Sequence, residues 1–251
     1  MPHIVKVLAE HSYAGADEPV RDVRIGLGYT AVQVESGAVG LAYTFRDDLP
    51  GGCTAFRGAR PLAGRKAADI LPYLDSTDKL EASVGLATVN ALVSRDVVHA
   101  FKGDVLDALD LRSSDLVGMV GFFDPLVKPL RDRVRELRIF ELAPRAEGLF
   151  GSEVAGEWLP RCDVALITST TLLNATLDDL LAACRGCRQV ALLGPSTPLV
   201  PGAFTGTPVT HLSGVLVADP EGVLRAVSEG GGMPSFRGLV RKVVVPVRST
   251  R

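Results

Sequence analysis

Hydrogen-bonding side chains gather after a short apolar run in the second half of the chain. They are Thr168, Ser169, Thr170, Thr171 and Asn174. Hydroxyls and a side-chain amide can hold a phosphate, a carboxylate or the polar edge of a ring. The run before them, Val164–Thr168, lacks polar alternation, which is typical of a strand buried on both faces of a parallel sheet. Open α/β sheets bind ligands where such strands end, so this stretch predicts a binding crevice.

Three other apolar runs in the second half end in comparable loops. The runs are Leu116–Gly121, Leu137–Leu142 and Gln189–Leu193, and their polar groups are Asp124, Glu141 and, after Gly194 and Pro195, Ser196. Because the carboxyl ends of parallel strands lie at one edge of a sheet, we expect these groups to converge on the hydroxyl loop. Prolines at 195, 198 and 201 stiffen the last loop, which lowers the entropy cost of holding a ligand.

Asp124 and Glu141 are the candidate charged groups of the crevice. Together they can coordinate a hard cation or serve as an acid/base pair in catalysis. Structural alternatives stay open: Asp124 before Pro125 is a common helix start, and Glu141 can pair with an arginine. Thr168 to Thr171 can likewise satisfy loop backbone and contact no ligand.

Helical patterns alternate with the strands of this half. Thr176 and Asp179 are spaced as a capping box, which predicts a helix over Leu177–Cys184. Further expected elements are helices over Leu126–Val134, Val154–Leu159 and Glu221–Ser228, and strands over Val209–Leu212, Val215–Val217 and Leu239–Val247. This alternation implies right-handed βαβ units and a mostly parallel sheet.

The first hundred residues show a different order, with strands first and helices after them. The strands Val23–Gly28, Ala31–Glu35 and Val39–Phe45 predict an antiparallel meander, and helices are expected over residues 4–9, Gly64–Leu74 and Asp78–Ser94. We therefore predict an α/β protein with an α+β domain over residues 1–100 and a second domain over residues 101–251. In the first domain, Thr30 in a tight turn and Asn90 in the second helix are candidates to face a ligand; a connecting turn and a surface position are the alternatives.

Composition narrows the class of partner. The net charge is −2 and the pI about 6.1, so no basic excess suggests nucleic acid. The N-terminus lacks the pattern of a signal peptide, and no apolar run reaches the roughly 18 residues of a membrane span. We expect a cytoplasmic protein without a membrane partner. A homodimer stays open because two-fold homo-oligomers are common.

Familiar catalytic and metal motifs are missing from the sequence. There is no G-x-G-x-x-G after the first strand of the second half, no Walker A loop, no G-x-S-x-G and no H-E-x-x-H. Of four cysteines, Cys184 and Cys187 have the C-x-x-C spacing of redox and zinc sites. With no second such pair and no histidine nearby, the favoured interpretation is that they end a helix at Gly186.

Several motifs resemble one protein family. They are Leu159-Pro160, Asp163-Val164, Thr168, Thr171-Leu172 and Asn174-Ala175-Thr176-Leu177, then Gly194-Pro195-Ser196-Thr197-Pro198, with Val120-Gly121-Phe122-Phe123 and Phe140-Glu141 upstream. This set resembles the DUF364 or "putative heavy-metal chelation" domain family. Ser83–Ala91 looks like the companion N-terminal domain, DUF4213.

The resemblance implies an enolase N-terminal-like domain followed by a Rossmann-like domain, with the site between them. It also implies handling of heavy metals or metal-chelating small molecules. The sequence offers no cluster of soft ligands, so a metal would have oxygen ligands or arrive in an organic chelator.

The sequence therefore predicts binding of a small polar or anionic ligand, with a metal ion or metal chelate as one candidate, in an interdomain cleft. The candidate ligand-binding residues are Thr30, Asn90, Phe122, Thr168, Thr170, Thr171, Asn174, Gly194, Pro195 and Ser196. The alternative is an enzyme that uses a nucleotide-type cosubstrate at the Rossmann-like edge, with Asp124 or Glu141 as the catalytic acid or base. A third hypothesis, a purely structural subunit, leaves the polar strand ends without a purpose.

Overall fold

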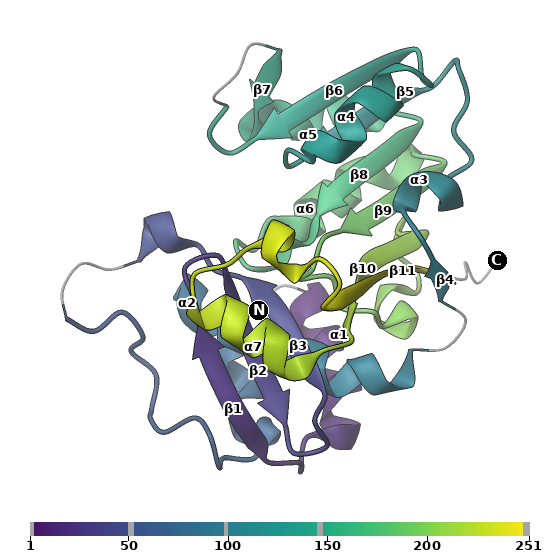
Figure 1. Ribbon diagram of the computed structural model, residues 1–251. Helices are drawn as coiled ribbons and strands as arrows, with labels where there is room; N and C mark the ends of the chain where they lie inside the picture. The colour runs from purple at the N-terminus through teal and green to yellow at the C-terminus, as the bar shows by residue number, and fades with distance from the viewer. Residues whose placement is uncertain (1–2, 50–52, 98–99, 145–147, 248–251) are drawn as a thin grey trace.

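Two β-sheets organise the chain, in a computed structural model that describes residues 3–49, 53–97, 100–144 and 148–247. The smaller sheet is antiparallel, with the order β1-β2-β3, and appears in purple and blue in Figure 1. Its strands are β1 (Val20–Ile25), β2 (Tyr29–Val34) and β3 (Val39–Tyr43). The three-stranded meander expected from the sequence is confirmed.

The larger sheet has eight strands in the order β4-β11-β10-β9-β8-β5-β6-β7. Its parallel strands are β5 (Leu116–Val120), β6 (Glu136–Glu141), β7 (Leu149–Gly151), β8 (Val164–Thr168), β9 (Gln189–Leu193) and β10 (His211–Val217). Two antiparallel strands, β11 (Val240–Pro246) and β4 (Phe101–Lys102), complete one edge. Counted from β5, the parallel strands have the doubly wound order 3-2-1-4-5-6 of the Rossmann fold, which reverses direction between β5 and β8.

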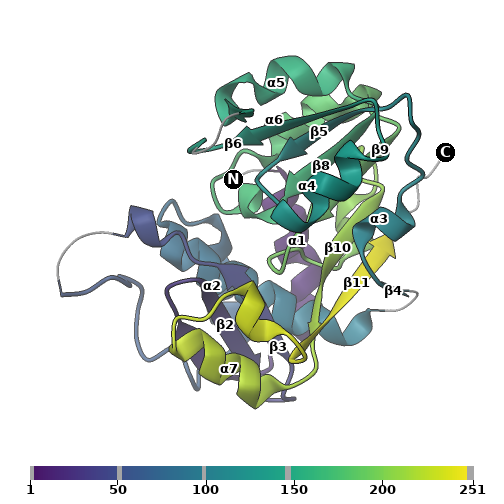
Figure 2. The same cartoon turned by 45° about the horizontal axis from the view of Figure 1, so that its top comes forward.

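Helices cover both faces of the large sheet (Figure 2). On one face lie α3 (Val105–Ala108) and α4 (Asp124–Arg131), which share a hydrophobic cluster with the sheet. On the other lie α1 (His3–Ser12), α5 (Ala155–Trp158) and α6 (Leu177–Ala183), within the largest cluster of the molecule. This three-layer arrangement explains the continuous apolar runs of β5, β8 and β9, because strands covered on both faces bury every side chain. No helix among these residues is long and apolar enough to cross a bilayer.

The helix α2 (Lys79–Val93) lies beneath the small sheet and is buried on almost every side. Its N-terminus is capped by Asp78, whose Oδ1 accepts hydrogen bonds from the amides of Leu80 at 2.8 Å and Glu81 at 3.3 Å. A helix that is apolar all round belongs inside a core. Consistent with that position, every residue of α2 except Lys79 and Glu81 is buried.

The last third of the chain returns to the small sheet. Helix α7 (Pro220–Ser228) packs on β1 and β2, and its Val223 and Val227 share a hydrophobic cluster with Leu41 and Phe236. The figures show α7, in yellow-green, lying against the small sheet (Figures 1 and 2). The small sheet is thus covered by α2 and by the much later helix α7. The division at residue 100 stays a prediction.

Most expected elements are confirmed within a few residues, and the α/β fold class is correct. The helix expected over Gly64–Leu74 is wrong: this stretch forms two 3₁₀ turns, Ala67–Asp69 and Leu71–Asp75. Pro72 at the start of the second turn cannot donate the hydrogen bond that a continuous α-helix needs. The two strands expected over Val209–Leu212 and Val215–Val217 are one, β10, because both Ser213 and Gly214 pair with β11. The short elements β4, β7 and α3 were not expected.

A close approach between β3 and α2 gives the first testable prediction. A Cβ atom on Gly40 would lie 2.1 Å from the Ala87 carbonyl oxygen and 2.2 Å from the Ala91 amide nitrogen. Backbone atoms of a buried helix cannot move aside cheaply. Gly40→Ala should therefore lower the free energy of unfolding in urea by about 1–3 kcal/mol, the usual cost of overpacking.

The matched control is Gly156→Ala in the short helix α5, where an added Cβ meets nothing within 4 Å. That variant should be neutral or more stable by up to about 1 kcal/mol, because alanine is the better helix former. A Gly40→Ala protein as stable as wild type would contradict the tight β3–α2 contact.

Candidate functional site

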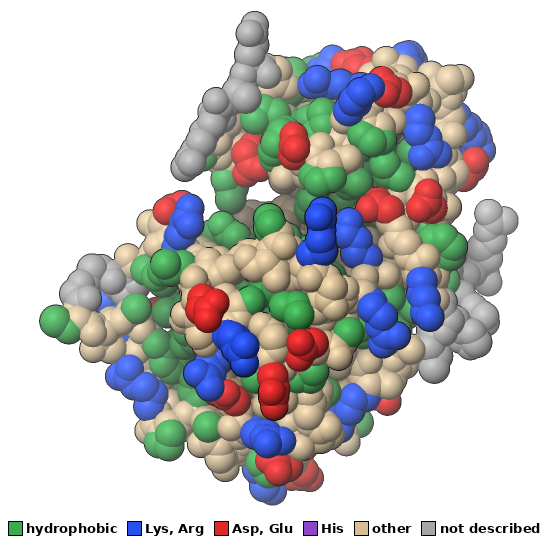
Figure 3. Space-filling view, in the orientation of Figure 1, with side chains coloured by type: hydrophobic (Ala, Val, Ile, Leu, Met, Phe, Trp, Pro, Cys, Tyr) green, Lys and Arg blue, Asp and Glu red, His purple; other side chains and the backbone are tan. Residues whose placement is uncertain are grey.

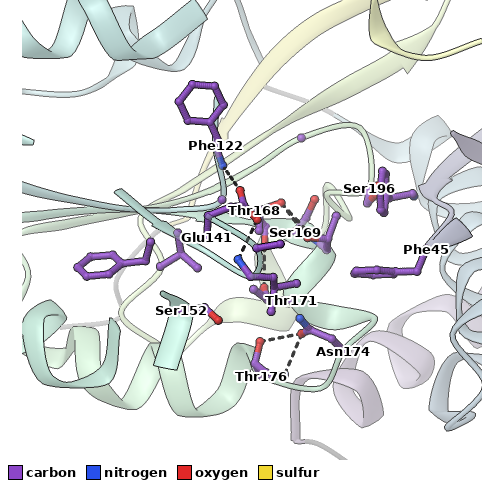
Figure 4. A pocket seen from close by; sticks show the side chains of 18 of the residues that line it. Phe45, Phe122, Glu141, Ser152, Thr168, Ser169, Thr171, Asn174, Thr176 and Ser196 are labelled. Atoms are coloured by element: carbon purple, nitrogen blue, oxygen red, sulfur yellow. Dashed lines mark hydrogen bonds between the residues drawn. The ribbon is translucent and has the colours of Figure 1, made fainter. Parts of the chain in front are cut away.

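A cavity of about 1010 Å³ opens between the small sheet and the carboxyl ends of the parallel strands. It corresponds to the hollow between the upper and lower parts of the surface in Figure 3, and Figure 4 shows its interior. The large sheet contributes the residues that follow β5, β6, β8 and β9, and the small-sheet side contributes the end of β3, the segment after it and Lys79. The cavity thus lies beside the reversal between β5 and β8, where open α/β sheets bind ligands.

Nine of the sequence-predicted site residues line this cavity. They are Phe122, Glu141, Thr168, Thr170, Thr171, Asn174, Gly194, Pro195 and Ser196. Three others lie elsewhere. Asp124 is the exposed first residue of α4, and Thr30 is a buried residue of β2 with its hydroxyl 3.0 Å from that of Thr44. Asn90 lies behind the loop after β9, where it lines a separate small cavity.

Some hydroxyls of the loop after β8 form hydrogen bonds with the protein's own backbone. Ser169 and Thr171 are buried; their hydroxyls donate to the carbonyls of Leu193 at 2.9 Å and Thr168 at 2.6 Å. Thr168 and Thr170 are half-buried, with their hydroxyls 3.0 Å apart. Each hydroxyl has two lone pairs and one proton, so this pair keeps capacity for a ligand. Two of the four hydroxyls thus shape the loop and two face the cavity.

Asn174 presents a side-chain amide to the cavity. Its Oδ1 accepts from the Thr176 hydroxyl at 2.7 Å and the Thr176 amide at 3.3 Å (Figure 4). Its Nδ2 has no acceptor among the residues that the structure describes, so both of its protons are left to donate. The expected capping box is wrong: Thr176 makes no side-chain cap to α6, because its backbone is helical at φ −97° and ψ −8°, whereas a capping residue is usually extended.

The Glu141 carboxylate is fixed by two backbone amides. Its Oε2 accepts from Phe122 N at 2.8 Å and its Oε1 from Leu142 N at 2.9 Å. The alternative from the sequence was that Glu141 pairs with an arginine. Glu141 forms no ion pair with any arginine that the structure describes. Gly121, at φ +90°, makes the turn that brings Phe122 N to the carboxylate. Glu141 is thus an oriented acceptor at the end of β6.

Hydrogen bonds join the loop after β9 to the small sheet. Ser196 Oγ accepts from Tyr43 N at 2.8 Å, and Ser83 Oγ donates to Tyr43 O at 2.7 Å. Asn90 Nδ2 donates to Leu41 O at 2.8 Å and to Ser196 O at 3.1 Å. Asn90 therefore positions the loop from behind and does not line the main cavity.

An aromatic wall on the small-sheet side was not predicted from the sequence. Tyr43 packs edge-on against Tyr29 and Phe45, with ring centroids 5.9 and 5.1 Å away, and Lys79 Nζ lies 4.7 Å from the centroid of Phe45. Burial, with a smaller contribution from Tyr43, raises the pKa of Tyr29 well above its usual range, so its phenol stays protonated. An aromatic at the end of an amphipathic strand is usual in a core, so no sequence signal separates these rings from ordinary packing.

The charges of the lining are mostly negative. Among the described residues, four carboxylates line the cavity against two cations; they are Asp47, Asp48, Glu141 and Glu153 against Arg46 and Lys79. Lys79 pairs with Asp48, and Arg46 lies 3.7 Å from Asp47. Glu141 and Glu153 have no cationic partner among the described ion pairs. This balance disfavours a ligand with several negative charges.

A soft heavy-metal ion does not fit the lining of this cavity. The lining contains no cysteine and no histidine, the ligands that such ions prefer. Across the described ranges, no three His, Cys, Asp or Glu side chains form a group able to hold a metal. The donors that are present are hydroxyls, amides and separate carboxylates, which suit an organic molecule better than a bare ion.

The C-x-x-C pair lies away from the cavity. Cys184 ends α6 and Cys187 precedes β9, near Cys162 at the amino ends of the strands. Burial raises the pKa of the Cys162 thiol to about 12, which keeps it unreactive. The helix end at Cys184–Gly186 agrees with the interpretation favoured from the sequence.

Comparisons with known proteins identify relatives along the whole chain. Residues 104–246 match the DUF364 family model and residues 8–93 match the DUF4213 model, both described as "Putative heavy-metal chelation". An uncharacterized protein of Methanocaldococcus jannaschii is 26% identical over 241 residues, covering 92% of this chain and 91% of its own.

Two solved structures share the fold, both titled as proteins with unknown function from the DUF364 family. The one from Pyrococcus horikoshii has a TM-score of 0.86 at 22% identity, covering 97% of this chain and 100% of its own. The one from Desulfitobacterium hafniense has a TM-score of 0.81 at 25% identity, covering 96% and 98%. Neither title states a ligand.

Backbone strain beside Asn174 gives the second prediction. Ala175 adopts φ 58°, a left-handed conformation that costs an L-residue roughly 1–2 kcal/mol. Ala175→Gly should raise the free energy of unfolding in urea by about 0.5–1 kcal/mol, since glycine avoids the strain but loses more backbone entropy.

Ala182→Gly, at an exposed position inside α6, is the matched control and should lower stability by about 1 kcal/mol. Equal destabilisation by both changes would show that Ala175 is not strained.

Proposed function

Because the chain belongs to the DUF364 family, we propose that its cavity binds a small polar organic molecule, free or as the chelator of a metal ion. The family's description concerns heavy-metal chelation, and the cavity side chains support a ligand that carries the metal with it. A bare soft ion would lack thiolate and imidazole ligands here. A chelated ion needs from the protein only hydrogen bonds to the organic part.

The observation that supports this proposal is a set of side chains around one cavity that can still form hydrogen bonds with a ligand. Asn174 Nδ2 is a free donor, Thr168 and Thr170 keep hydroxyl capacity, and Glu141 is an oriented acceptor. These groups come from the ends of two strands and from the segment after one of them, and all line the same space. Sites of this kind combine an apolar wall with a few placed polar groups, and the aromatic rings supply that wall.

The polarity of the ligand follows from the charge balance of the lining. Asp48 and Asp47 neutralise the two cations, so a multiply charged anion would meet the uncompensated carboxylates Glu141 and Glu153. Neutral or cationic groups that donate hydrogen bonds are favoured at that end. The anionic ligand considered from the sequence is therefore the weaker form of the proposal.

Of the two acids predicted as catalytic from the sequence, Asp124 and Glu141, only Glu141 lines the cavity. Asp124 does not line the cavity, so it is poorly placed to act on a bound molecule. Glu141 lines the cavity, but its two oxygens each hold a backbone amide, an arrangement that suits binding. We therefore favour ligand binding over acid/base catalysis by this pair.

Native mass spectrometry with elemental analysis tests the proposal. The protein is purified without chelators, incubated with a low-molecular-mass cell extract and desalted. Wild type should carry one organic molecule per chain, with or without a metal. Asn174→Ala should bind this molecule about five- to tenfold more weakly and therefore carry less of it. This is the usual effect of losing one hydrogen bond of about 1 kcal/mol.

Thr205→Ala is the control, because Thr205 is exposed and lies outside the cavity lining. It should retain the wild-type ligand. Metal bound in stoichiometric amount without an organic molecule would contradict the chelator form of the proposal, and an apo mass for all three proteins would contradict ligand binding.

A further inference from the structure

The position of Glu141 in the sheet identifies the part of a ligand that it would contact. In chain order, β5 and β6 are the first two strands of the doubly wound sheet, and Glu141 is the last residue of the second. It lies twenty residues after Gly121, the glycine that turns the chain out of the first strand. In doubly wound sheets that bind nucleotides, an acid at this strand end and this spacing accepts hydrogen bonds from ribose hydroxyls.

The Glu141 carboxylate is held in an orientation that suits such contacts. Phe122 N and Leu142 N each occupy one lone pair of one oxygen, which fixes the plane of the group. An ionised carboxylate has about four acceptor positions, so one remains on each oxygen. No cation among the described residues takes either of them. Two adjacent hydroxyls of one sugar present two donors side by side and can fill both positions.

The turn after β5 excludes a dinucleotide. After Gly121 the chain continues with Phe122 and Phe123, where a pyrophosphate loop would need further glycines for close approach. The Phe122 amide, which would face a phosphate, already donates to Glu141. Together with the excess of carboxylates in the lining, this favours a ligand with few or no phosphates.

Apolar side chains flank the carboxylate at the cavity mouth. Phe122 is 46% exposed and Leu142 is 58% exposed, although both are large apolar residues that line the cavity. The backbone amides of Phe122 and Leu142 donate to the Glu141 carboxylate. Figure 4 shows the Phe122 ring extending outward from the loop after β5. An exposed aromatic ring next to a hydroxyl-binding acid offers a surface on which a base can stack.

We propose that Glu141 accepts the 2′- and 3′-hydroxyls of a ribonucleoside-type ligand, with Phe122 stacking on its base. The inference rests on the proposed ligand-binding function and names the chemical class for that cavity. It distinguishes a ribonucleoside from free sugars and polyols, which share the vicinal hydroxyls but carry no base to stack.

Isothermal titration calorimetry on the full-length protein tests this assignment. The probes are adenosine, guanosine, cytidine and uridine, each with its 2′-deoxy counterpart, and ribose alone. At least one ribonucleoside should bind, and its 2′-deoxy form should bind about tenfold more weakly, the effect expected for a lost hydrogen bond to a charged acceptor. Ribose alone should bind more weakly than the nucleoside.

Variants assign the effect to the named residues. Glu141→Gln should weaken the ribonucleoside about tenfold and its 2′-deoxy form by a smaller factor, because the ribonucleoside places two hydroxyls on the carboxylate and the 2′-deoxy form only its 3′-hydroxyl. Phe122→Ala keeps the backbone amide on Glu141 and should weaken both forms equally. Glu157→Gln, an exposed acid on α5 outside the cavity lining, should change neither.

The possible results separate the ribonucleoside assignment from the ligand-binding function on which it rests. Equal binding of ribo and 2′-deoxy forms, or equal loss of both in Glu141→Gln, overturns the hydroxyl-binding role. Failure of every nucleoside to bind, when mass spectrometry finds another molecule in the wild-type cavity, overturns the ribonucleoside assignment and leaves the ligand-binding function intact. Absence of a ligand in both experiments overturns both.

Discussion

The close packing of α2 against β3 is the constraint on which the cavity depends. Gly40 lets the two backbones approach, and the buried helix then carries Asn90 to the rear of the loop after β9. Asn90 and Ser83 hold the end of β3, and Ser196 holds the Tyr43 amide from the other side. The small sheet and the parallel sheet are thereby locked at a short distance, and the space left over is the cavity.

The two walls of that space differ in chemistry because they come from different kinds of sheet. The parallel strands end in loops, so their wall is rich in hydroxyl, amide and carboxylate groups, several of which keep hydrogen-bonding capacity. The antiparallel meander contributes the end of β3 with the ring of Tyr43; Phe45 and Asp48 follow in the next segment, and Lys79, paired with Asp48, begins α2. A ligand there meets hydrogen bonds on one side and an apolar wall on the other.

Sequence patterns predicted the fold and one wall of the cavity well. Continuous apolar runs identified β5, β8 and β9, because a strand covered on both faces tolerates no polar residue. The rule that parallel strands end at one edge then brought nine of the predicted residues together. Asp124 lies outside the cavity lining as the exposed first residue of α4, and Thr30 is buried with its hydroxyl against that of Thr44. The aromatic wall depends on how the two sheets meet, which no local pattern encodes.

The return of α7 to the small sheet has a consequence for how the chain is made. Domains generally fold as they emerge during synthesis, the N-terminal part first. Ala31 and Leu41, however, share a hydrophobic cluster with Val227 and Phe236, which are synthesised only after β10. One face of the meander therefore waits, apolar and uncovered, while the whole parallel sheet is being synthesised. The nascent chain should accordingly be a client for chaperones that shield hydrophobic surface until α7 and Phe236 have been synthesised.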